Sequence, residues 1–123
     1  MAQLRKDLEI KPIKVGLCTL NYLRIEVHYT NGGYSWFNGE YAESGIRVSI
    51  TPIGMSERTT RTIIDGKIEH QGFNVPIIKC ERLSVKKMEL AAQKVFPYAE
   101  EIRDLFEKGE YYEIVKLIQN IQY

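Results

Sequence analysis

The sequence has few of the features that most readily reveal a function. It has only two cysteines in 123 residues, Cys18 and Cys80, too few for the disulfide framework of a small secreted protein. It has no run of eighteen apolar residues and no apolar segment typical of a signal peptide at its start. These absences predict a cytoplasmic protein with two reduced thiols and no membrane contact.

Motifs for catalysis and for cofactor binding are also missing. The chain contains no P-loop, no G-x-G-x-x-G fingerprint and no G-x-S-x-G nucleophile turn. Its cysteines and histidines, Cys18, His28, His70 and Cys80, have none of the close pair spacings of zinc sites. We therefore expect no metal, no cofactor and no enzymatic activity.

Neither sign of charge is in large excess. The net charge is +1, which by itself indicates neither a nucleic-acid binder nor an acidic tail. Residues 1–87 hold thirteen basic and nine acidic residues, whereas residues 88–123 hold four basic and seven acidic ones. The length of 123 residues and the apolar fraction of 44% are typical of one globular domain, so we expect a single domain over residues 1–123.

Alternating apolar and polar residues predict strands in the first part of the chain. The clearest strand covers 22–30, where Leu23, Ile25 and Val27 alternate with polar side chains. The other segments that favour strands are 14–20, 34–37, 45–53, 58–64, 67–71 and 73–80. Glycine-containing turns such as Asn31-Gly32-Gly33 and Asp65-Gly66 predict hairpins between them. Residues 1–13 are compatible with either a short helix or an arm.

Helical periodicity replaces strand periodicity after Ser84, which is a predicted N-cap. Pro97 and Gly109 are expected to end the first and second helices, and a third apolar stripe follows over 111–121. Strands followed by helices predict an α+β fold. We expect an antiparallel sheet of about five to seven strands over residues 14–80, followed by two or three C-terminal helices over 84–122, packed on one face.

Aromatic and apolar side chains provide the first candidate surface. Six aromatic residues fall within residues 22–41, and the last helix is apolar on more than one side. Such residues can anchor a protein interface, although aromatic residues also pair across strands without any ligand. The candidate partner-binding residues are Tyr22, Tyr34, Trp36, Tyr41, Tyr112 and Leu117. The last two also suggest a homodimer through the C-terminal helix.

Basic residues provide a second candidate surface, which could follow the phosphates of a nucleic acid. Its members are Arg47, Arg58, Arg61 and Lys67. Arg58 and Arg61 are three residues apart and would point to opposite faces of a regular strand, so a solvated edge strand is the competing interpretation.

A third group, Arg24, Glu26 and His28, shares one strand face and could support acid–base chemistry, but no nucleophile accompanies it. The leading hypothesis is therefore a small non-enzymatic interaction module that binds a protein partner, such as a phage or mobile-element accessory or inhibitor protein. The alternative is a single-stranded nucleic-acid-binding protein.

Overall fold

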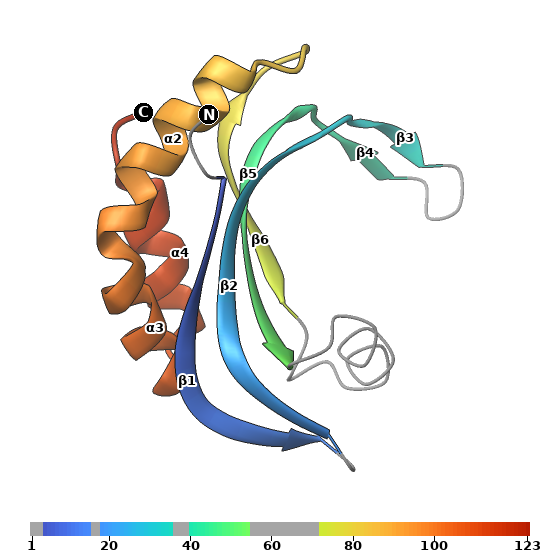
Figure 1. Cartoon of the computed structure of the whole chain (residues 1–123). Coiled ribbons are helices and arrows are strands. Elements are labelled where there is room, and N and C mark those ends of the chain that lie inside the picture. Colours follow the sequence, from blue (N-terminus) through green and yellow to red (C-terminus); the bar gives the residue numbers. More distant parts are fainter. Residues whose placement is uncertain (1–3, 16–17, 36–39, 55–71) are drawn as a thin grey trace.

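The computed structural model of the chain describes residues 4–15, 18–35, 40–54 and 72–123 (Figure 1). Four strands form one antiparallel sheet in the order β1-β2-β5-β6. Their bounds are Arg5–Val15, Cys18–Thr30, Gly45–Gly54 and Phe73–Lys79. Two short strands, β3 (Gly33–Ser35) and β4 (Glu40–Ala42), pair only with each other.

Three α-helices follow the sheet. They are α2 (Val85–Val95), α3 (Ala99–Glu107) and α4 (Tyr111–Gln119), and a 3-10 turn, η2 (Phe96–Tyr98), joins the first two. The hydroxyl of Ser84 accepts a hydrogen bond from the N–H of Lys87 at 3.3 Å, which confirms the predicted N-cap. Gly109 has a φ of 74°, a conformation that glycine adopts without a Cβ penalty, and it ends α3 as predicted.

The helices pack on one face of the sheet and bury its apolar side chains (Figure 1). On β2, Leu23, Ile25 and Val27 are at most 1% exposed, and the inward residues of β5 are buried as completely. The helices contribute four side chains with no exposed surface: Val95, Ile102, Ile114 and Ile118. The predicted α+β class and the alternation along residues 22–30 and 45–53 are therefore confirmed.

The strands bend away from the helices, so the other face of the sheet is concave (Figure 1). Each pair of neighbouring strands in the main sheet contains one register shift. The shifts lie between Glu9 and Ile13 in β1, between Leu20 and Tyr22 in β2, and beside Ile77 in β6, which is the extra residue between two paired positions. Extra residues of this kind bend and twist a strand, which explains the curvature.

The strand count and two pairings differ from the sequence-based expectation. The main sheet has four strands among the described residues, fewer than five to seven, and the predicted strands over 58–71 lie outside those residues. Residues 5–15 form a strand instead of a helix or an unpaired arm, because Leu4 and Leu8 pack against the core on one face. The segment that follows Gly32-Gly33 pairs with β4 and not with β2, because β1 and β5 occupy both edges of β2.

Candidate functional site

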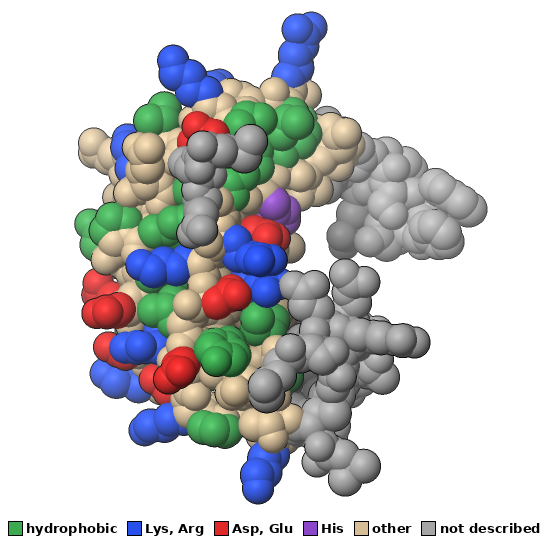
Figure 2. Space-filling view, in the orientation of Figure 1, with side chains coloured by type: hydrophobic (Ala, Val, Ile, Leu, Met, Phe, Trp, Pro, Cys, Tyr) green, Lys and Arg blue, Asp and Glu red, His purple; other side chains and the backbone are tan. Residues whose placement is uncertain are grey.

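The open face, meaning the concave side of the sheet opposite the helices, is lined by polar side chains from all four strands. One row across the sheet consists of Arg5, Glu26, Ser49 and Asn74, and a second places Asp7 opposite Arg24 and Arg24 opposite Thr51. A third row places His28 opposite Arg47, and Arg47 opposite Pro76. Figure 2 shows acidic, basic and histidine side chains gathered beside the hollow of the molecule.

A hydrogen bond across the face shows how strongly it is curved. Nε2 of His28 on β2 lies 3.3 Å from Oδ1 of Asn74 on β6. These strands are not neighbours, because β5 runs between them, and two strand spacings correspond to about 9.5 Å. Two such side chains meet when the sheet is concave on their side, so curvature brings the polar groups of distant strands together.

An ion pair holds the side chain of Arg24 in one orientation on this face. Its Nε donates to Oδ1 of Asp7 at 3.1 Å, and its Nη2 donates to Oδ2 of the same carboxylate at 3.4 Å. The side chains of Arg24 and Asp7 are 18% and 34% exposed. A two-point contact of this type fixes the guanidinium plane, which orders the face before any ligand binds.

Arg24, Glu26 and His28 share the open face, as their spacing predicts. Two of the three side chains are engaged, Arg24 by Asp7 and His28 by Asn74. Within the described residues, no group of three histidine, cysteine, aspartate or glutamate side chains is placed to hold a metal ion. The arrangement can orient and hydrogen-bond a ligand.

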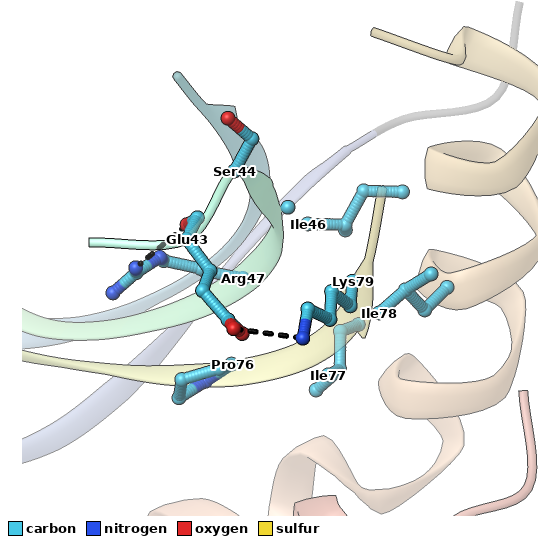
Figure 3. A pocket seen from close by; sticks show the side chains of 9 residues that line it. Glu43, Ser44, Ile46, Arg47, Pro76, Ile77, Ile78 and Lys79 are labelled. Carbon is cyan, nitrogen blue, oxygen red and sulfur yellow. Dashed lines mark hydrogen bonds and ion pairs between the residues drawn. The ribbon is translucent and has the colours of Figure 1, made fainter. Parts of the chain in front are cut away.

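A cavity of about 440 Å³ continues the open face at the start of β5 and the end of β6 (Figure 3). Nζ of Lys79 and Oε1 of Glu43 form an ion pair of 2.7 Å at its wall. Arg47 donates from Nη2 to the backbone oxygen of Glu43 at 3.5 Å. Because Arg47 is also opposite His28, this cavity and the His28–Asn74 pair belong to one continuous surface.

The β3–β4 hairpin extends from one end of the sheet on the side away from the helices (Figure 1). Tyr34 and Tyr41 are opposite each other in its register. The N–H of Gly32 donates to the hydroxyl oxygen of Ser44 at 2.8 Å, which ties together the two ends of the hairpin segment. Trp36, a predicted partner-binding residue, lies outside the described residues.

The predicted partner-binding residues fall in three separate regions. Tyr22 is half-buried on the open face, eight residues along β2 from Thr30, or about 26 Å from the hairpin end of the strand. Tyr112 is on α4, on the other side of the sheet, where it is 72% exposed and Nζ of Lys116 lies 5.0 Å from its ring centre. Leu117 packs in part against the core, so it is partly covered within its own chain.

Of the four predicted basic residues, one is among the described residues. Arg47 lies on the open face, while Arg58, Arg61 and Lys67 lie outside the described residues. Sequence reasoning missed Asp7, Asn74 and Glu43 as members of the surface. Their polar side chains gave a weak signal, because only the folded chain brings them to Arg24, His28 and Lys79.

Comparisons with family models, curated proteins and solved structures found no match to this chain. No helix among the described residues is long and apolar enough to span a membrane.

Proposed function

We propose that the protein is a non-enzymatic interaction module that binds a protein partner with its open face and the β3–β4 hairpin. The observation that supports this proposal most strongly is that the two faces of the sheet differ in whether helices pack on them. Helices bury one face, whereas no described helix packs on the other, which is concave and lined by hydrogen-bonded and ion-paired polar groups. A concave surface with ordered hydrogen-bonding groups loses little entropy when it binds, which favours recognition.

The charges of the open face favour a protein over a nucleic acid. Among the described residues of this surface and its cavity, four basic residues are matched by four acidic ones: Arg5, Arg24, Arg47 and Lys79 against Asp7, Glu9, Glu26 and Glu43. A surface that follows phosphates gains most from an excess of basic residues. Mixed charges instead suit a partner with a complementary pattern of both signs.

The β3–β4 hairpin, at one end of this surface, contains two tyrosines. Tyr34 and Tyr41 are paired in its register, and tyrosine is among the residues that contribute most to protein interfaces. Tyr22, half-buried on the open face toward the other end of β2, offers a second anchor. The proposed contact surface therefore has an aromatic residue toward each end and polar groups between them.

Site-specific photo-cross-linking in cells of the organism whose genome encodes the protein tests the proposal. A photoreactive phenylalanine analogue replaces Tyr22 or Tyr41 in one set of variants, and Tyr112 in a matched control. Tyr112 is a suitable control because it is exposed and lies on the helical side. We expect the Tyr22 and Tyr41 positions to give covalent adducts with the same protein, and the Tyr112 position to give none with it.

Two results would contradict the proposal. Adducts that form only from the Tyr112 position would indicate that the contact surface lies on the helical side. Adducts with RNA or DNA from the Tyr22 and Tyr41 positions would favour nucleic-acid binding. Anisotropy of a labelled single-stranded oligonucleotide would then show binding that weakens steeply with salt.

A further inference from the structure

A second surface lies between α2 and β6, beside Tyr123. It adjoins the cavity at the end of the open face, with which it shares Ile77, Ile78 and Lys79. It contains a groove with a volume of about 390 Å³. Its apolar lining consists of Ile77 and Ile78 from β6 and Leu90 and Ala91 from α2, and Tyr123 also lines it. This volume is at the small end of the range for ligand sites, about 300–1,000 Å³, so it suits one or two inserted side chains.

Lysines provide all the charged side chains of this groove. Lys79, Lys87 and Lys94 line it, and no acidic side chain is among the described residues that do so. The charge of Lys79 is balanced by Glu43. Nζ of Lys94 donates to the backbone oxygen of Gln122 at 2.7 Å, which is a neutral acceptor.

The helix face that borders the groove alternates lysine with exposed leucine. Lys87, Leu90 and Lys94 recur at intervals of three and four residues, which places them on one face of α2. Leu90 is 48% exposed, and Leu83, just before the helix, is 61% exposed. Apolar side chains flanked by cations match a segment that carries apolar side chains flanked by carboxylates.

The edge of β6 itself is poorly suited to accept another strand. Pro76 has no N–H to donate, and the extra residue Ile77 interrupts the regular ladder. A partner would therefore bind through its side chains rather than by adding a strand. The phenol of Tyr123 adds no negative charge to the groove: burial raises its pKa to about 12, and its hydroxyl donates to the oxygen of Ile118 at 2.8 Å.

We propose that this groove binds an acidic peptide segment of a partner protein, with one or two apolar side chains in the groove and carboxylates beside Lys87 and Lys94. This inference goes beyond the proposed function, because the groove binds its ligand through Lys87, Leu90 and Lys94, none of which lines the open face or its cavity. The two surfaces can be tested separately, since the groove does not include the hairpin or Tyr22.

Selection from a display library of random twelve-residue peptides on the full-length protein tests the inference. We expect the enriched peptides to carry a large apolar residue with at least two acidic residues near it. Affinities of the enriched peptides are then measured by fluorescence anisotropy for the wild type and for variants. Lys87→Glu and Leu90→Ser are each expected to weaken binding at least fivefold.

The Lys87→Glu variant should keep its fold. Lys87 is the third residue after the N-cap Ser84, and glutamate at that position completes a capping box, which stabilises the start of the helix. Lys86→Glu is the matched control, because it makes the same charge change one residue away, at a side chain that does not line the groove. We expect Lys86→Glu and the hairpin variant Tyr41→Ala to change the affinity less than twofold.

Several outcomes would overturn the inference. One is a set of enriched peptides without acidic residues, and another is equal weakening by Lys86→Glu and Lys87→Glu. A third combines two results: no peptide is enriched, and vesicles of phosphatidylglycerol bind the wild type but not the Lys87→Glu variant. The ligand would then be a lipid surface. A fourth is a dimer in light scattering that Lys87→Glu dissociates, which would make the occupant a second copy.

Discussion

The two faces of one sheet have opposite roles in this protein. On β2, Ile25 is fully buried beneath the helices, while its neighbours Arg24 and Glu26 point to the open face. The same strand therefore contributes to the hydrophobic core on one side and to a polar binding surface on the other. Stability depends mainly on the covered face, because burial of apolar surface is the largest favourable contribution to folding. The open face is therefore freer to carry function.

The largest expected effect comes from a matched pair of substitutions on β2. Ile25→Ala removes a fully buried side chain and should lower the free energy of unfolding by about 2–5 kcal/mol. Glu26→Gln changes a side chain on the open face and should alter it by less than about 0.5 kcal/mol. Urea denaturation of both variants measures the difference. Similar losses for the two would contradict the assignment of the faces.

The next effect concerns the bend that makes the open face concave. Gly45 is opposite Lys79 at the end of the β5–β6 pair, next to the register shift. A Cβ at Gly45 would overlap the backbone oxygen of Ile78, which cannot move without loss of strand pairing. Gly45→Ala should therefore cost about 1–3 kcal/mol in thermal or urea denaturation. An unchanged stability would show that the strands near the bend can separate freely.

A smaller effect tests how the helices are held over the covered face. Ser84→Ala removes the hydroxyl that accepts from the N–H of Lys87, and it should cost about 1 kcal/mol. Because α2 packs on the core through Met88, Ala91, Ala92 and Val95, the helix should remain in place. Circular dichroism during urea denaturation gives both the stability and the helix content. A large loss of helix content in the native state would contradict the view that packing holds α2.

The smallest effect concerns the ion pair on the open face. Asp7→Asn removes the charge that fixes Arg24 and should cost about 0.2–1 kcal/mol, since both side chains are partly exposed. The difference from the wild type should shrink at high salt, because exposed charges are screened. Urea denaturation at low and high ionic strength measures it. A cost above 2 kcal/mol would mean that the open face contributes to stability like a core.

Local sequence patterns predicted the elements that depend on short-range rules. The alternation over residues 22–30, the N-cap at Ser84 and the helix end at Gly109 follow from side-chain periodicity and backbone geometry. The strand over residues 5–15 was harder to predict, because the register shift between Glu9 and Ile13 interrupts the alternation of apolar and polar residues in β1. A bulge of this kind moves the later residues out of phase with the earlier ones.

The candidate site could be predicted only in part. Alternation placed Arg24, Glu26 and His28 on one face, but it could not show which residues of other strands meet them. Asp7 and Asn74 join this face through pairing across 17 and 46 residues of sequence. The glycine pair after Asn31 suggested that the next segment would pair with β2. Instead, β2 pairs over a longer stretch with β5, and the segment after the glycines pairs with β4. Strand partners depend on the whole sheet and not on one turn.

The most direct test of the central claim is the affinity of the purified cross-linked partner for two variants, measured by titration calorimetry. Tyr22→Ser alters the open face, and Tyr112→Ser alters an exposed tyrosine on the helical side. If the open face binds the partner, Tyr22→Ser weakens the affinity at least fivefold and Tyr112→Ser changes it less than twofold. The reverse order, with Tyr112→Ser the more damaging, would contradict the claim that the uncovered face carries the function.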